Sequence, residues 1–300
     1  MRYVLRKAVL GKVPEIEITE ENYLALQNAR EVLTNALAIE EKYEILICNY
    51  LEFEKQILND TAYYMVRSIT GYSDFFDVRL ALNVRLVNLL TSARLYIDQL
   101  KRHVSGCVPV LKEEIIKALF SKEYDGNPEY RFMENLRNHV QHRGLPIHWV
   151  SQGGSWTEAG ENGFLEYSTE FASRRSFLEE DGGFKQSVLQ ESDDKIDLKK
   201  YTRCYIESIG NIHDSARKII AEPVSTAREL LQDAHSKYKA ISNESLAGLS
   251  VYALSEAGTT GSFPILLDWD DIRIELQKRN RKAINLKKRY VTGKGKTDSK

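Results

Sequence analysis

Apolar residues recur at three- and four-residue steps over two long stretches of the N-terminal half, and this spacing predicts two long helices. The stretches cover residues 20–67 and 75–103. Thr19, with Asn22 and acidic residues after it, is typical of a helix N-terminus. The apolar residues of the second stretch nearly encircle the predicted helix, so we expect it to lie at the centre of a bundle: Phe76, Leu80, Val84, Val87, Leu90, Leu95 and Ile97.

Helical spacing continues in most of the remaining chain. Further helices are predicted at residues 111–120, 129–143, 198–220 and 270–290. The helix that begins at residue 198 is expected to kink or restart at Pro223 and to continue to residue 241.

Three segments have a different pattern. Residues 3–10 alternate weakly, as in a short strand, and residues 245–269 favour neither helix nor strand. Residues 146–195 are rich in glycine and serine and alternate in places, which predicts a β-hairpin with arms at 147–150 and 164–167, followed by a loop.

These elements predict a mainly α fold, an antiparallel helical bundle with a small β-hairpin insertion. No glycine- or serine-rich segment is long enough to act as a flexible linker, so we expect one domain over residues 1–300 with the insertion at 146–195. Residues 291–300 are predicted to form a flexible basic tail.

Composition narrows the functional classes. The net charge is −1, with 42 basic and 43 acidic residues, so any phosphate binding must come from a local cluster and not from an overall basic surface. The three cysteines are far apart and form no CxxC pair, which favours a reducing compartment. No window is long and apolar enough to span a membrane, and the N-terminus lacks the pattern of a signal peptide. We expect a cytoplasmic protein without a membrane partner.

The densest polar stretch is LRNHVQHRGLP, at the predicted end of the helix at 129–143. Gly144 suits the left-handed position that ends a helix, and Pro146 follows it. Asn138 and His142 are four residues apart and share a helix face. Arg137 and His142 are five apart, so on an ideal helix they point away from each other and converge only if the helix end deforms, the arginine bends round, or a second chain completes the site.

The run Arg137-Asn138-x-x-x-His142 resembles the R-x(4–6)-H motif of HEPN-domain proteins, and its setting after two long helices is also similar. The resemblance covers roughly residues 20–146. It implies a metal-independent endoribonuclease without a cofactor, in which Arg137 and His142 are catalytic and Asn138, His139 and Arg143 are supporting. It also implies a homodimer whose two motif helices face each other.

The residue types suit this chemistry. RNA carries its own nucleophile, the 2′-hydroxyl, and an imidazole can take its proton while another protonates the leaving oxygen. Arginine can hold the phosphate and offset the charge that develops on it. The expected products are a 2′,3′-cyclic phosphate and a 5′-hydroxyl.

The resemblance suggests a toxin or antiphage defence effector, with an antitoxin or a defence-system protein as a partner. One position departs from the family pattern. HEPN toxins that are silenced by nucleotidyltransferase antitoxins have a tyrosine two residues after the motif histidine, where this chain has Gly144. Control by adenylylation at that position is therefore not expected.

Three alternatives remain open. The stretch can be an ordinary polar helix end, since arginine and histidine are favoured near helix C-termini. It can belong to a non-catalytic module of the same fold that binds RNA or a protein. It can also be a metal site of His139, His142 and His148, although no carboxylate or cysteine completes the set and the HExxH pattern is absent.

A basic segment near the C-terminus is a second candidate for RNA contact. Lys287, Lys288 and Arg289 lie in the run KRNRKAINLKKRY. A solvated helical face explains such a run more often than phosphate binding does.

Overall fold

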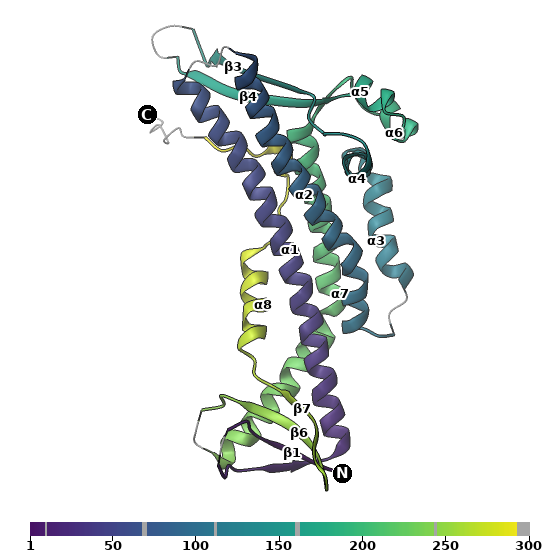
Figure 1. Ribbon diagram of the computed structural model, residues 1–300, viewed down its shortest axis with the longest axis vertical. Helices are drawn as coiled ribbons and strands as arrows, with labels where there is room; N and C mark the ends of the chain where they lie inside the picture. The colour runs from purple at the N-terminus through teal and green to yellow at the C-terminus, as the bar shows by residue number, and fades with distance from the viewer. Residues whose placement is uncertain (10, 68–70, 111–112, 160–162, 243–244, 293–300) are drawn as a thin grey trace. The chain divides into compact units, whose positions relative to one another are not determined.

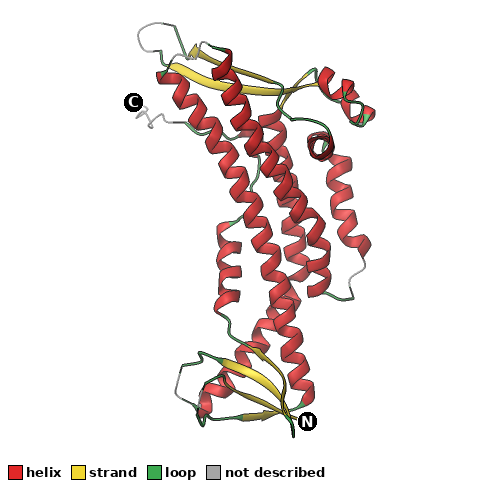
Figure 2. Ribbon diagram, in the orientation of Figure 1, coloured by secondary structure: helices red, strands yellow, loops and turns green. Residues whose placement is uncertain are grey.

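The computed structural model describes residues 1–9, 11–67, 71–110, 113–159, 163–242 and 245–292. The chain is mainly helical, with small antiparallel sheets (Figure 1, Figure 2). Its helices are α1 (Glu20–Val66), α2 (Tyr72–Cys107), α3 (Glu113–Gly126), α4 (Pro128–His142), α5 (Arg175–Glu180), α6 (Gln186–Gln190), α7 (Leu198–Ile241) and α8 (Asp268–Arg279). Its strands are β1 (Arg2–Lys7), β2 (Ile16–Ile18), β3 (Trp149–Trp156), β4 (Leu165–Arg174), β5 (Lys195–Asp197), β6 (Leu249–Ser255) and β7 (Gly258–Pro264).

The chain divides into two compact units. Unit 1 contains residues 1–47, 92–118 and 214–281, and unit 2 contains residues 48–91, 119–213 and 282–300. The long helices α1, α2 and α7 therefore each contribute residues to both units. That the whole chain folds as one domain stays a prediction.

Unit 1 contains an antiparallel sheet with the strand order β2-β1-β6-β7 (Figure 1). β1 pairs with β6 in the register that places Leu5 opposite Val251, and both side chains are buried. The hydroxyl of Tyr238 near the end of α7 donates to the carbonyl oxygen of Pro14 at 3.1 Å. The start of α1 is fixed by Thr19, whose Oγ1 accepts from the Asn22 amide at 3.1 Å and confirms the predicted N-terminus.

Unit 2 contains a second antiparallel sheet, with the order β3-β4-β5. The buried face of β4 packs on α1, where Phe171 meets Phe53 edge to face with ring centroids 5.6 Å apart. Next to this contact the Thr61 hydroxyl donates to Thr169 Oγ1 at 2.9 Å. The predicted hairpin is confirmed, and its arms are longer than predicted because the pairing continues from Trp149 to Trp156.

Helix α4 is fixed to the rest of unit 2 by its buried face. Tyr130, Phe132, Met133 and Leu136 are fully buried on this face. The Tyr205 hydroxyl of α7 donates to Glu134 Oε1 at 2.6 Å, and this bond joins the two helices. The buried face of α4 therefore determines which of its polar residues point inward.

The predicted helices agree with the structure except at two places. α7 runs for 44 residues with Pro223 inside it, so the helix does not restart there, and the kink that was the other possibility stays a prediction. Proline removes one backbone donor, and the buried residues on both sides of it, Ile220 and Val224, keep the helix packed. The helix predicted at 270–290 ends at Arg279, and a short 3₁₀ helix, η1 (Leu286–Lys288), follows after Asn285, which is in the left-handed region at φ 55°.

Two predictions from the chain pattern need correction. The segment at 245–269, which favoured neither state, forms the β6–β7 hairpin. The expectation that α2 is buried on all sides is wrong, because Phe76, Leu80, Val84 and Leu95 are each more than one-third exposed. One face of α2 is buried, and its apolar residues there are Leu82, Leu86, Leu89, Leu90, Ala93, Tyr96, Leu100 and Val104.

The segment predicted as loop after the hairpin holds α5, α6 and β5. Most of the predicted basic tail, residues 293–300, lies outside the described residues. Across the described parts of the chain, no helix has both the length and the apolar character that crossing a membrane requires.

Asp60 is a buried carboxyl at the contact between α1 and the hairpin. It is only 8 % exposed, its Oδ1 accepts from Gln56, and its Oδ2 has no hydrogen-bond partner. Burial raises its pKa above the usual value. Gln152 of β3 donates to the Asp60 carbonyl oxygen at 3.2 Å, and its own side-chain oxygen is buried without a partner.

We expect Asp60→Asn to stabilise the protein by about 1 kcal/mol at pH 7, since an amide removes the cost of a buried charge and keeps the acceptor used by Gln56. The folded-state pKa of Asp60 lies above its unfolded value, so ionised Asp60 lowers stability at neutral pH and ceases to do so below the unfolded pKa. Urea unfolding should show the gain at pH 7 and none at pH 3. An equal gain at both pH values would contradict the role of the charge.

Candidate functional site

The C-terminal turn of α4 carries the residues that the sequence singled out. The helix ends at His142, and the amides of Arg143 and Gly144 both donate to the carbonyl oxygen of His139, at 2.8 and 3.4 Å. Arg143 has φ −134°, and Gly144 is not among the described glycines with positive φ. The predicted left-handed conformation of Gly144 is therefore wrong, and the helix ends instead at Arg143, whose φ of −134° and ψ of −69° are not helical.

Arg137 points into the interior of unit 2. Its side chain is 4 % exposed, and its Nη2 lies 3.1 Å from Glu134 Oε2 and donates to Asn138 Oδ1 at 3.1 Å. Glu134 also accepts from Tyr205. In a single chain the guanidinium therefore has a structural ion pair and is not accessible to a phosphate outside.

Asn138, His142 and Arg143 are exposed. Asn138 and His142 lie one helical turn apart on the same face, as expected from their spacing. Arg137 and His142 are separated by roughly 140° around an ideal helix, and one is buried while the other is exposed. The expectation that they point apart is confirmed.

His139 is buried, with 2 % of its surface exposed. Its Nε2 lies 3.4 Å from Asp181 Oδ2, and neither ring nitrogen makes a hydrogen bond. Burial lowers the pKa of this imidazole, Asp181 opposes the shift, and Arg143 adds to it. His139 is thus part of the packing of the helix end and does not join His142 at the surface.

His148, which follows Pro146 at the start of the hairpin, is a second partly buried imidazole beside His139. The Arg174 amide donates to its Nδ1 at 3.1 Å, so Nδ1 is the unprotonated nitrogen. Its ring stacks on Phe177 with centroids 4.9 Å apart. Burial lowers its pKa, and the nearby His139 lowers it further. From the sequence, His148 is a candidate only as a metal ligand. Its hydrogen-bond and stacking partners lie about 25 residues further along the chain, so no local sequence pattern indicates them.

His139 and His142 do not come together as metal ligands, although His148 lies beside His139. His139 is buried and His142 is exposed, so the two imidazoles do not face one ion. Over the residues that the structure describes, no group of three histidine, cysteine, aspartate or glutamate side chains is arranged to hold a metal ion.

The basic segment near the C-terminus is held in unit 2 by backbone contacts. The amides of Asn285 and Leu286 each donate to the Glu207 carboxylate at 3.1 Å, and Arg203 Nη1 donates to the Arg289 carbonyl oxygen at 2.5 Å. The side chains of Lys287, Lys288 and Arg289 are exposed on this anchored turn. Their predicted contact with RNA stays a prediction.

No protein-family model matches the chain, and no curated protein and no solved structure is significantly similar to it. The resemblance to HEPN proteins stays a prediction that rests on the motif and its helical setting.

We expect Arg137→Ala to destabilise the protein by about 3 kcal/mol, because it removes one partner of a buried ion pair and leaves Glu134 without its counter-charge. His142→Ala should change stability by less than about 0.5 kcal/mol, since this side chain is exposed. Urea unfolding followed by circular dichroism measures both. Equal stability of the two variants would contradict the buried position of Arg137.

His139 and His148 should make stability depend on pH. Their folded-state pKa values lie below the unfolded value of 6.5, so the stabilisation from keeping these rings neutral is complete above pH 6.5 and is lost as the pH falls through the folded values. We expect unfolding free energy to fall between pH 7 and pH 5, and to fall less in His139→Gln. An NMR titration in which both rings take up protons at or above pH 6.5 would contradict this.

Proposed function

We propose that the chain is a metal-independent endoribonuclease with a HEPN-like helical bundle, acting as a homodimer with His142 as its catalytic residue. The observation that carries the proposal is the group of exposed side chains at the end of α4. His142 and Asn138 share one face there, and Arg143 follows directly. Such a group offers an imidazole, an amide and a guanidinium to one nucleotide.

The proposed reaction needs two proton transfers. One imidazole takes the proton of the 2′-hydroxyl, whose oxygen forms a bond to phosphorus, and a protonated imidazole gives its proton to the 5′-oxygen as the P–O5′ bond breaks. The products are a 2′,3′-cyclic phosphate and a 5′-hydroxyl. The exposed group contains one imidazole per chain, so a second copy of α4 would supply the other.

The buried position of Arg137 changes the roles proposed for the two arginines. Arg143 is exposed and takes the role of phosphate contact. Arg137 becomes a positioning residue, since its Nη2 donates to Asn138 Oδ1 at 3.1 Å and orients that side chain beside His142. Lys287, Lys288 and Arg289 would add contacts to the RNA backbone.

A second candidate function is a non-catalytic module that binds RNA or a protein such as an antitoxin. The observation that favours it is the buried ion pair of Arg137 with Glu134, which keeps the motif arginine away from a ligand. In this case Asn138, His142 and Arg143 form a binding surface only.

Incubation with single-stranded RNA of mixed sequence, with EDTA present, tests the proposal. We expect the wild type to cleave RNA, His142→Ala to cleave it at least 100-fold more slowly, and Gln141→Ala, an exposed neighbour, to match the wild type. The same strand made of 2′-deoxynucleotides should stay intact. The end groups should be the two named above.

The outcomes separate the candidates. Binding of RNA without cleavage would support the non-catalytic module. Cleavage that survives in His142→Ala, or that needs a divalent cation, would contradict the proposed mechanism. If a dimer of the chain neither binds nor cleaves RNA, both the nuclease function and the RNA-binding function are rejected.

A further inference from the structure

Unit 1 contains a pocket of about 470 Å³ between α7 and α8. Four basic residues line it, namely Arg217, Lys218 and Arg228 of α7 and Arg273 of α8. No acidic residue is part of this lining. The pocket wall therefore contains four cationic groups, each of which pairs with a carboxylate that is not part of the lining.

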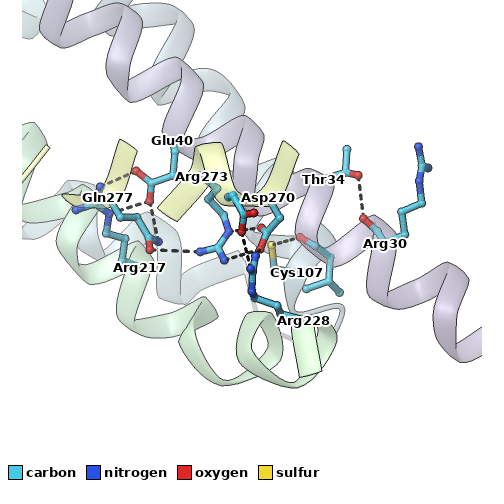
Figure 3. A network of polar contacts seen from close by, with 11 residues as sticks. Arg30, Thr34, Glu40, Cys107, Arg217, Arg228, Asp270, Arg273 and Gln277 are labelled. Carbon is cyan, nitrogen blue, oxygen red and sulfur yellow. Dashed lines mark hydrogen bonds and ion pairs between the residues drawn. The ribbon is translucent and has the colours of Figure 1, made fainter. Parts of the chain in front are cut away.

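Carboxylates that are not part of the lining hold two of these arginines in place (Figure 3). Arg273 donates to Asp270 through Nε at 2.5 Å and through Nη2 at 3.0 Å. Arg228 Nη1 donates to Asp270 Oδ2, the oxygen that also accepts from Arg273 Nη2, and its Nη2 donates to Asp271 Oδ1 at 2.5 Å. One buried carboxylate thus orients two guanidinium groups.

The third arginine is held in the same way (Figure 3). Arg217 donates to Glu40 through Nε at 2.8 Å and Nη2 at 2.6 Å, and to the Asn280 carbonyl oxygen at 2.9 Å. Gln277, which lines the pocket, also donates to Glu40 at 3.1 Å. Glu40 and Asp270 are both 0 % exposed, and neither lines the pocket.

The arginines retain donors for a ligand. A guanidinium has five N–H groups, and Arg228 uses two of them in its bonds to Asp270 and Asp271. Because carboxylates already fix the orientation of each guanidinium group, little side-chain entropy would be lost when an anion binds. Lys218 pairs with Asp214 on its own helix at 2.9 Å, and its side chain is largely exposed.

Four of the six remaining lining residues are apolar, and the other two are Ser225 and Gln277. Ile220, Val224 and Ile274 line the pocket together with Ala221. A small inorganic anion would leave this surface in contact with water. A ligand that combines an anionic group with an apolar body would cover both parts of the wall.

We propose that this pocket binds an organic phosphate, with the phosphate held by Arg217 and Arg228 and the apolar body against Ile220, Val224 and Ile274. Arg273 is only 5 % exposed and supports Asp270 without touching the ligand. A phosphate monoester is favoured over a carboxylate because two guanidinium groups can bind its three oxygens at once. This site is separate from the α4 site, and its ligand does not depend on the proposed nuclease activity.

Titration calorimetry with three probes tests the proposal on the full chain. Phenyl phosphate has both parts of the expected ligand, inorganic phosphate has only the anion, and phenol has only the ring. We expect phenyl phosphate to bind at least tenfold more tightly than either of the others. Its affinity should fall as salt is added.

A matched pair of charge variants locates the binding. Ser225 is exposed and lines the pocket, and Thr226 is exposed on the same turn but does not line it. Ser225→Asp places a negative charge in the wall and should weaken phenyl phosphate binding at least tenfold. Thr226→Asp adds the same charge outside the pocket and should change the affinity less than twofold.

Each other outcome overturns the proposal. Equal affinity for phenyl phosphate and phenol would show an apolar pocket without an anion site. Equal affinity for phenyl phosphate and inorganic phosphate would show that the apolar wall is not used. Absence of binding by a folded wild type, or an equal effect of the two aspartate variants, would exclude this pocket as the site.

Discussion

A guanidinium group that leaves water must keep a counter-charge close by, and this constraint governs both units of the chain. In unit 1, Glu40 pairs with Arg217 and joins α1 to α7. In unit 2, Arg203 of α7 pairs with Glu54 of α1 through two bonds, at 2.7 and 2.8 Å. Each pair joins residues that are about 150 or more positions apart, so it selects one pairing of helices among many that apolar packing alone would allow.

The helices could be predicted from the sequence because their signals are local. Apolar spacing and the Thr19 cap lie within a few residues of the structure that they produce. The β6–β7 hairpin lacked such a signal, since β7 is rich in glycine and threonine and is positioned by the strand beside it. The end of α8 was missed for a related reason, because the turn after it depends on Glu207, which lies 78 residues earlier.

The candidate site was predicted in part. The five-residue spacing of Arg137 and His142 correctly indicated that the two side chains diverge. It did not indicate which of them points inward, because this depends on Glu134 and on Tyr205 of α7, whose hydroxyl donates to Glu134. A tyrosine 68 positions further along the chain cannot be recognised as a partner of the motif from spacing alone. The exposure of His142 follows from the same contact, since α4 buries the opposite face.

Pairing with a carboxylate leads to opposite consequences for the arginines of the two candidate sites. Glu134 holds Arg137 inside unit 2, where the guanidinium has no access to a ligand. Asp270 holds Arg228, and the free N–H groups of Arg228 remain at the wall of a pocket. The two arginines differ in exposure, because the Nε and Nη1 groups of Arg137 are buried without a partner, whereas Arg228 lines a pocket. A sequence motif does not contain this information, since burial is decided by the packing of the helix that carries the arginine.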